Sequence, residues 1–210
     1  MEIEVILMPT EKDIIHAAAI AKTSYHNENY ESFKDMKYED AVTFLVGLID
    51  KGHRSALEPL EYIFNITGIS RVLTHELVRK RIGFSYMQKS LRRRRKFDPK
   101  SMILKKEVEK DRDIYEEVAA FCIEKYNFLI DKRKNSPDEA RRIIPPGLPT
   151  EITFTCNARS LRHFLKQRLD KAANWEIRKL AAKIASILIA EGQGFLIRDV
   201  LQYFNEREKK

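Results

Sequence analysis

Three short segments in which apolar and polar residues alternate constrain the fold of this chain more than any other feature. Residues 2–7, 61–67 and 152–156 each place apolar side chains at every second position. A period of two is typical of a β-strand with one buried face. Longer helical patterns separate these strands without a regular strand–helix alternation, which favours an α+β fold over a doubly wound parallel sheet. We therefore predict an α+β fold with a small sheet and long helices, formed as a single domain over residues 1–210.

Capping residues define the helices expected in the first half of the chain. Thr10 with Asp13 is a typical helix start, and Gly52 is a typical stop. Ser70 can cap a helix that follows the second strand. From these signals and the apolar faces between them, we expect helices over residues 11–21, about 38–51 and 69–82.

The second half contains further helix signals and one predicted loop. Gly83 can break the third helix, so the segment GFSYMQKSLRRRRKF is predicted to be a loop or an irregular extension. A long charged helix or helix pair is expected over roughly 102–134, and Ser136 followed by Pro137 starts another helix. After the third strand, Asn157 or Ser160 opens one long helix, which continues until Gly192.

The cysteines and the amino-terminal residues indicate where the chain works. Cys122 and Cys156 are the only cysteines, and their spacing supports neither a disulfide framework nor a zinc site. Both lie on apolar faces, so we expect inert core residues in a reducing compartment. No basic leader and no membrane-length apolar run is present, and His75 lacks the second histidine of a zinc helix. We expect a cytoplasmic protein without a membrane span or a metal.

A dense basic cluster follows the third predicted helix. Arg79-Lys80-Arg81 precedes Gln88, Ser90 and the run Arg92 to Arg95, in a chain of formal net charge +8. Guanidinium groups bind phosphate in a bidentate fork, so the cluster favours a phosphate-bearing ligand such as a nucleotide. A solvated basic loop is the alternative. Neither a Rossmann glycine pattern nor a phosphate-loop pattern is present, so any flavin must be held in another way.

A second polar cluster stands at the end of the third strand. Asn157, Arg159 and Ser160 lie at the expected helix start, with His163 and Arg168 further along the helix. Backbone N–H groups point outward at such a start, where they can bind a ligand. Helix capping combined with surface charge explains the same residues equally well. The turn GHRS at 52–55, with Glu58, is a third and weaker candidate.

The segment GISRVLTHELVRKRIGFSYMQKSLRR at 68–93 resembles the signature region of the flavin-dependent thymidylate synthases. That motif is Arg-His-Arg, then seven or eight residues, then Ser, and here Arg79-Lys80-Arg81 is followed after eight residues by Ser90. Further blocks are similar to the family in the same order: AKTSY at 21–25, GHRSALEPLEYIF at 52–64, ARRIIP at 140–145 and NARSLRHFLKQRLDKAANWEI at 157–177. The resemblance therefore extends over most of the chain.

The resemblance implies which residues contact each ligand. For the flavin cofactor it implies Ser55, Arg79, Lys80, Arg81, Gln88, Asn157, Arg159 and His163. For the deoxyuridine nucleotide it implies Glu76, Arg79, Gln88, Ser90, Arg92, Arg141 and Arg168. Arg168 matches the arginine thought to favour ionisation of the uracil ring, which makes it the implied catalytic residue. The reaction then needs no cysteine nucleophile.

The resemblance also implies an activity and an assembly. Family members methylate deoxyuridine monophosphate to thymidine monophosphate for nucleotide biosynthesis. FAD carries the hydride, NADPH is the reductant and methylenetetrahydrofolate supplies the carbon. They are homotetramers whose sites form between subunits, around a small, mainly antiparallel sheet flanked by long helices. We expect this chain to be such an FAD-dependent methyltransferase with a small-molecule substrate.

Two departures from the family pattern keep other hypotheses open. Lys80 replaces the histidine of the motif, and Glu76 stands where glutamine is usual; the two could weaken nucleotide binding or compensate each other as an ion pair. One alternative is therefore a divergent homologue that binds flavin or nucleotide without thymidylate synthase activity. A nucleic-acid binding protein built on Arg92 to Lys96 is the third hypothesis, disfavoured because no aromatic residues interleave that run.

Overall fold

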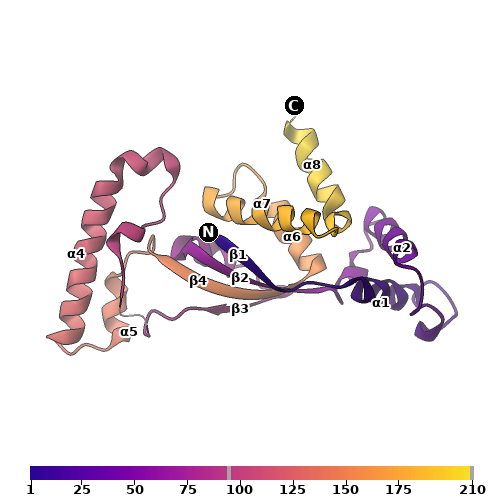
Figure 1. The fold of residues 1–210 in the computed structure, drawn as a ribbon, viewed down its shortest axis with the longest axis horizontal. Coiled ribbons are helices and arrows are strands. Elements are labelled where there is room, and N and C mark those ends of the chain that lie inside the picture. The colour runs from indigo at the N-terminus through magenta and orange to yellow at the C-terminus, as the bar shows by residue number, and fades with distance from the viewer. Residues whose placement is uncertain (94–95, 209–210) are drawn as a thin grey trace. The chain divides into compact units, whose positions relative to one another are not determined.

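The computed structural model of the chain describes residues 1–93 and 96–208 and has an α+β fold (Figure 1). A single four-stranded antiparallel sheet has the order β1-β2-β4-β3. Its strands are β1 Glu2–Leu7, β2 Glu61–Ser70, β3 Phe84–Gln88 and β4 Pro149–Asn157. The helices are α1 Glu11–Lys22, α2 Tyr38–Asp50, α3 Arg71–Leu77, α4 Arg112–Asp131, α5 Pro137–Ala140, α6 Ala158–Arg168, α7 Trp175–Ala190 and α8 Arg198–Glu208. The predicted fold class is confirmed.

The chain divides into two compact units. The first unit comprises Met1–Glu2, Asn65–Arg79 and Tyr86–Thr153, and the second comprises Ile3–Phe64, Lys80–Ser85 and Phe154–Lys210. Both β2 and β4 therefore begin in one unit and end in the other. No helix within the described part of the chain has both the length and the apolar character needed to cross a bilayer.

The core of the second unit is a chain of buried aromatic rings. Tyr62 stacks on Phe64 with ring centroids 5.9 Å apart, and Phe64 contacts Phe154 at 5.4 Å. Phe84 lies 5.6 Å from Phe154 and 6.0 Å from Phe164 of α6. Each such pair contributes about 0.5–1.5 kcal/mol beyond its buried area. The aromatic chain therefore fixes the start of α6 against the strands, while α1 and α2 pack side by side in the same unit (Figure 1).

The first unit has its own hydrophobic core under α4. Its buried members are Met102, Ala119, Tyr126, Ala140, Ile144 and Leu148. Phe97 meets the Tyr126 ring edge-on, with centroids 5.5 Å apart. Because Ala119 and Tyr126 lie two helical turns apart on α4, one stripe of the helix faces this core.

Several helix ends are where the capping signals predict them. Thr10 caps α1, and Asp13 completes the capping box by accepting from the Thr10 backbone N–H at 2.8 Å. Gly52, with a φ of 82°, follows the end of α2. The Ser70 hydroxyl accepts from the Leu73 N–H at 3.1 Å and caps α3. Local side-chain chemistry therefore sets these boundaries.

Residues Phe84–Gln88 form strand β3, so the prediction of a loop or irregular extension after Gly83 is wrong for these five residues. Burial alternates along β3, because Phe84 is buried and Tyr86 half-buried while Ser85 and Met87 are exposed. Met87 is apolar yet exposed and Gln88 is polar yet half-buried, so the sequence does not show this period clearly. The preceding helix is also shorter than predicted: α3 ends at Leu77, whose carbonyl accepts from the Tyr86 hydroxyl at 2.8 Å instead of continuing the helix.

The long helix predicted after the third strand is two helices, α6 and α7, separated at residues 169–174. Asp170 accepts from the Ala172 N–H at 2.9 Å, and Asn174 accepts from the Glu176 N–H at 2.9 Å and caps α7. Such local side-chain bonds compete with helical hydrogen bonds. The helix predicted over 102–134 likewise begins only at Arg112, after a short 3-10 turn.

Two burial predictions are also corrected. Cys156 is buried as expected, whereas Cys122 is only half-buried on α4. The alternation in β1 predicts one buried face, yet Val5 and Leu7 are exposed. Strand β1 and helix α4 thus each carry apolar side chains that are not fully buried within a single copy of the chain.

Candidate functional site

The predicted ligand residues fall into two groups, one in each compact unit. The second unit holds Ser55, Lys80, Arg81, Asn157, Arg159, His163 and Arg168. The first unit holds Glu76, Arg79, Gln88, Ser90, Arg92 and Arg141. Most residues that the resemblance assigns to flavin therefore share the second unit, and most of those assigned to the nucleotide share the first. Arg94 and Arg95, also part of the basic run, lie outside the described residues.

The amino-terminal end of α6 is fixed by the residues around it. The Asn157 side chain accepts from the Ser160 N–H at 2.9 Å and caps the helix. The segment 80–85 lies directly against this cap, because a Cβ on Gly83 would come within 2.1 Å of the Ser160 hydroxyl oxygen. Gly83 also has a φ of 67°, which disfavours other residues. A glycine is therefore required where the basic segment meets α6.

Lys80 reaches α6 through a side-chain hydrogen bond. Its Nζ donates to Oε1 of Gln167 at 2.9 Å, and Gln167 directly precedes Arg168. Burial lowers the pKa of Lys80, and the nearby charge of Arg168 lowers this pKa further. The pKa of His163 is also lowered, first by burial and then by the charge of Lys80. The structure thus gathers Lys80, His163 and Arg168 around one stretch of α6.

Arg159 and Ser55 lie near the short 3-10 turn Arg54–Leu57. Arg159 forms an ion pair with Glu58, which directly follows that turn. Both side chains are about half exposed, so the pair contributes at most about 1 kcal/mol. Arg159 can therefore exchange Glu58 for an anionic ligand at little cost.

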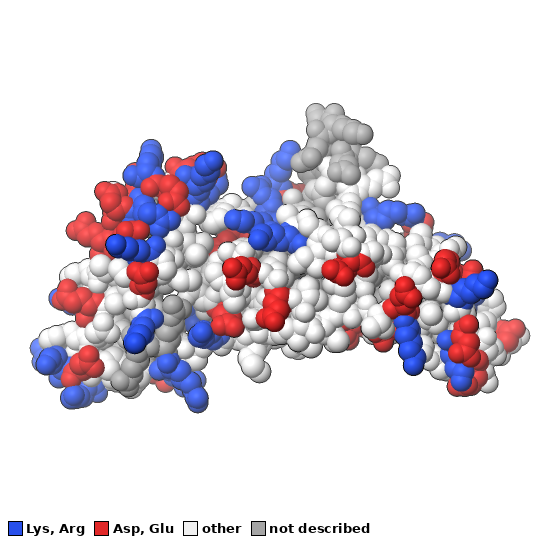
Figure 2. Space-filling model, viewed as in Figure 1, with Lys and Arg blue, Asp and Glu red and all other residues white. Residues whose placement is uncertain are grey.

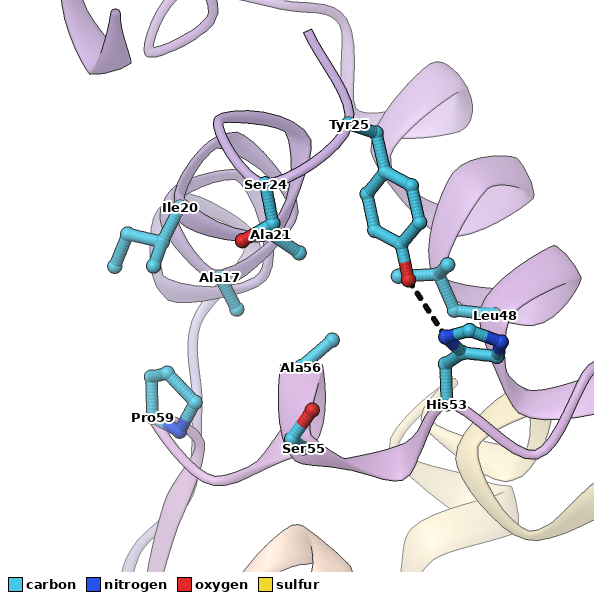
Figure 3. A pocket seen from close by; sticks show the side chains of 10 residues that line it. All are labelled: Ala17, Ile20, Ala21, Ser24, Tyr25, Leu48, His53, Ser55, Ala56 and Pro59. Carbon is cyan, nitrogen blue, oxygen red and sulfur yellow. Dashed lines mark hydrogen bonds between the residues drawn. The ribbon is translucent and has the colours of Figure 1, made fainter.

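Ser55 also lines a cavity of about 180 Å³ formed by α1, α2 and this turn (Figure 3). The Tyr25 hydroxyl lies 2.7 Å from Nδ1 of His53 at one side of the cavity. The wall residues are Ala17, Ile20, Ala21, Ser24, Tyr25, Leu48, His53, Ser55, Ala56 and Pro59. The walls combine apolar side chains with a few hydroxyl groups and the His53 ring.

In the first unit, two of the predicted arginines meet at one carboxylate. Arg92 donates to Asp138 at 3.3 Å, and Arg141 contacts the other carboxylate oxygen at 3.0 Å. Asp138 lies in α5, the short helix whose start the sequence predicts. The structure therefore brings together two arginines that are 49 residues apart in sequence, at positions assigned to the nucleotide.

The remaining first-unit residues surround α3 and β3. The Gln88 amide donates to the buried Thr74 hydroxyl at 2.9 Å, which fixes the orientation of this side chain. Ser90 accepts from the Arg92 backbone N–H at 3.2 Å. Glu76 is half-buried, whereas Arg79, just after the end of α3, is exposed. Arg81, in the second unit, is also exposed.

Sequence reasoning misses three of the residues that organise these groups. Gln167 positions Lys80, Thr74 positions Gln88, and Asp138 joins Arg92 to Arg141. Gln167 alone gives a usable signal, because it lies four residues after His163 and hence on the same face of the helix. Within the described residues, no group of three or more His, Cys, Asp or Glu side chains is arranged to hold a metal ion.

Comparisons with known proteins identify the family that this chain is similar to. The family model described as thymidylate synthase complementing protein matches residues 6–191. A flavin-dependent thymidylate synthase from Pyrococcus abyssi is 36% identical over 171 residues, covering 78% of this chain and 69% of the relative. The Clostridium tetani enzyme of the same name is 35% identical over 188 residues, covering 80% and 75%. The structure of the Helicobacter pylori flavin-dependent thymidylate synthase with FAD and dUMP has a TM-score of 0.74 at 25% identity, covering 95% of this chain and 99% of that one.

Proposed function

This chain belongs to the flavin-dependent thymidylate synthase family, the thymidylate synthase complementing proteins, and we propose that it methylates deoxyuridine monophosphate to thymidine monophosphate. In this proposal FAD is the hydride carrier, NADPH the reductant and methylenetetrahydrofolate the carbon donor. The observation that carries it is the set of cationic and polar side chains along α6, namely Arg159, His163 and Arg168 with Lys80 beside them. The Helicobacter pylori relative was solved with FAD and dUMP, which supports the same ligands here.

The donor set of the second unit fits a flavin dinucleotide. FAD carries two phosphates, and Arg159 in the first turn of α6 has a half-exposed guanidinium, a group that binds phosphate in a bidentate fork. His163 is held neutral near pH 7 by its lowered pKa, so its ring can accept or donate a hydrogen bond to a flavin edge. We propose Ser55, Arg79, Lys80, Arg81, Gln88, Asn157, Arg159 and His163 as the cofactor residues.

The first unit offers a phosphate site of suitable chemistry for the nucleotide. Arg92 and Arg141 share the Asp138 carboxylate through half-exposed contacts. Since such ion pairs contribute about 0–1 kcal/mol each, a phosphate dianion can replace the carboxylate. Gln88, with its amide oriented by Thr74, can hydrogen-bond a pyrimidine edge. We propose Glu76, Arg79, Gln88, Ser90, Arg92, Arg141 and Arg168 as the nucleotide residues.

Arg168 is the proposed catalytic residue. Its guanidinium would stabilise negative charge on the uracil ring, which increases the nucleophilicity of the ring carbon that accepts the one-carbon unit. When bound, FAD supplies the hydride that completes the methyl group. A cysteine nucleophile is not needed, which agrees with Cys156: burial raises the pKa of its thiol well above the ordinary value, so it stays protonated.

We also propose that the chain works as a homotetramer in the cytoplasm. Exposed apolar side chains form one stripe of α4, where Ile114, Val118 and Phe121 are 54–60% exposed. Burial of such a stripe by another copy of the chain is the simplest explanation. The half-buried Cys122 and buried Cys156 are both free thiols, in keeping with a reducing compartment.

The proposal is tested by the absorbance spectrum of the purified protein with FAD, followed by anaerobic reduction with NADPH with and without deoxyuridine monophosphate. Flavin bleaching that depends on the nucleotide supports the synthase. Bound flavin that NADPH cannot reduce under either condition favours the alternative, a divergent homologue, which the replacement of the motif histidine by Lys80 motivates. No flavin binding under any condition contradicts both.

The nucleic-acid hypothesis has a separate test. Over α4, the face in Figure 2 shows acidic side chains intermixed with basic ones, unlike the continuous basic surface that tracks a phosphate backbone. Binding to single-stranded DNA at low salt that weakens steeply with added salt would support this hypothesis. We expect no such binding.

A further inference from the structure

We propose that Gln167 is a positioning residue that holds the Lys80 ammonium as a second fixed positive charge beside Arg168, and that this charge stabilises the reduced, anionic form of the flavin. This inference rests on the proposed function, because it requires that the second unit binds flavin. It gives a role to the residue by which this chain departs from the family motif.

The geometry begins with the hydrogen bond between Lys80 Nζ and Gln167 Oε1, 2.9 Å long. Lys80 lies between α3 and β3, and Gln167 lies in the last turn of α6. A lysine side chain is long and flexible, so a hydrogen bond to its ammonium narrows the volume over which its charge is spread. The bond to Gln167, a neutral acceptor, holds the ammonium next to Arg168 without cancelling its charge.

Burial and a neighbouring cation both disfavour the charge on Lys80. Arg168 is close enough to lower the pKa of Lys80, in addition to the effect of burial. Lys80 in turn lowers the pKa of His163. Two cations held near each other repel, and an anion between or beside them offsets this repulsion. The arrangement therefore favours a ligand that gains negative charge during the reaction.

Reduced flavin is such a ligand. Its ring system is neutral when oxidised and gains a delocalised negative charge when it is reduced by two electrons and takes up a single proton. A nearby fixed cation stabilises the reduced form more than the oxidised form and so raises the midpoint potential. An imidazole at position 80 would be largely neutral near pH 7, whereas an ammonium is charged. Lys80 should therefore make the bound flavin easier to reduce than a histidine would.

The experiment compares the unaltered protein with Lys80→Met, Lys80→Arg and Gln167→Leu. The midpoint potential of bound FAD is measured by spectroelectrochemistry at pH 7, and the ratio of dissociation constants for oxidised and reduced FAD is determined in parallel. We expect Lys80→Met to reduce the preference for reduced flavin about tenfold, which corresponds to a midpoint about 30 mV lower for a two-electron couple. Gln167→Leu should shift it in the same direction by a smaller amount, and Lys80→Arg should retain most of the original value.

The outcomes separate this inference from the proposed function. Nucleotide-dependent flavin reduction with equal midpoints in the unaltered protein and Lys80→Met would overturn the inference and leave the proposed function intact. Absence of flavin binding by the unaltered protein would overturn both. Thermal melts of each variant identify a folding defect. If Lys80→Met fails to fold, the test uses Gln167→Leu, which retains the ammonium. An unchanged flavin midpoint potential in Gln167→Leu would contradict the role of the hydrogen bond.

Discussion

One glycine that lies against the start of α6 links its own backbone conformation to the candidate site. Gly83 combines a left-handed backbone with direct contact against Ser160, so neither a side chain nor a shift of the strand can be accommodated easily there. The same contact holds the segment that begins with Lys80 against α6. The placement of the candidate binding residues therefore depends on Gly83, a residue that has no side chain.

A matched pair of glycine substitutions tests this dependence. Gly83→Ala should lower the free energy of unfolding by about 2–5 kcal/mol, because the left-handed backbone and the contact with Ser160 both oppose a Cβ. Gly52 has a φ of 82°, but the space around an added Cβ is open. Gly52→Ala should therefore lower the free energy of unfolding only by the backbone cost of about 1–2 kcal/mol. Urea unfolding measures both. Equal losses would show that the contact with Ser160 has no energetic weight.

The ionisation of His163 gives a second prediction at the residue scale. Its pKa should lie below the ordinary histidine value, because burial and then the charge of Lys80 disfavour the imidazolium. The folded state therefore binds fewer protons at this residue than the unfolded chain. Its contribution to stability is complete above the ordinary pKa and declines as the pH falls through the folded value. NMR titration of the histidine ring should show the pKa rising in Lys80→Met but not in Lys80→Arg; no change in Lys80→Met would contradict the proximity of the two groups.

The sequence indicates the types of residue in the site better than their partners. Family resemblance assigns Arg92 and Arg141 to the nucleotide, and the structure places both on Asp138. Nothing in the spacing predicts this meeting, because it depends on how α5 lies in the first unit. The bond from Lys80 to Gln167 is equally non-local, joining residues 87 positions apart. Side chains fixed by non-local packing therefore require the structure.

At the scale of elements, helices and strands form where the local sequence predicts them unless a tertiary contact or a local side-chain hydrogen bond opposes this. The capping residues predict α1 and the end of α2 correctly, since these signals act within one turn. Strand β3 is missed because its sequence lacks a clear alternation of apolar and polar residues. Its pairing with β4 places it in the sheet instead. The α6–α7 break is missed because the polar side chains at 170 and 174 bond locally inside an otherwise continuous helical pattern.

The attachment of α8 to α6 rests on a buried arginine. Arg162 is 3% exposed, and its Nη2 donates to both carboxylate oxygens of Asp199 at 2.7 and 2.8 Å. Its Nε and Nη1 are buried and have no hydrogen-bond partner within the described residues. Burial lowers the pKa of Arg162, and Asp199 opposes that change. Asp199 thus compensates part of the cost of burying this charge.

Removal of the two partners should have unequal effects. Asp199→Ala should destabilise the fold by about 3 kcal/mol, because it leaves a buried guanidinium without a counter-charge. Arg162→Met should be close to neutral, since the methionine fills the same apolar space. The double variant should resemble Arg162→Met in chemical denaturation. Equal losses in both single variants would instead indicate that the ion pair itself is strongly stabilising.

At the scale of the whole molecule, the exposed apolar residues are the basis of the proposed assembly. Phe121 and Ile114 lie two helical turns apart on one side of α4 and are 60% and 59% exposed. At the sheet edge, Val5, Ile6 and Leu7 of β1 are also exposed. Apolar surface on both a helix and an edge strand is typical of chains that associate with copies of themselves.

A charge placed in the α4 stripe should separate the subunits. Phe121→Glu introduces a carboxylate where the proposed interface excludes water, so the molar mass measured by light scattering should fall below that of the unaltered protein. Ala120→Glu adds the same charge to an exposed neighbour outside the stripe and should leave the mass unchanged. A monomeric mass for the unaltered protein, or equal masses for both variants, would contradict an interface at this stripe.

The most direct test of the proposed function is the formation of thymidine monophosphate. The protein is incubated anaerobically with deoxyuridine monophosphate, FAD, NADPH and methylenetetrahydrofolate labelled at its methylene carbon, and nucleotides are separated by chromatography. The account predicts label in thymidine monophosphate that requires all four components and disappears in Arg168→Ala. Bound flavin with unlabelled nucleotide under every condition would contradict it and identify the chain as a family member that has lost the reaction.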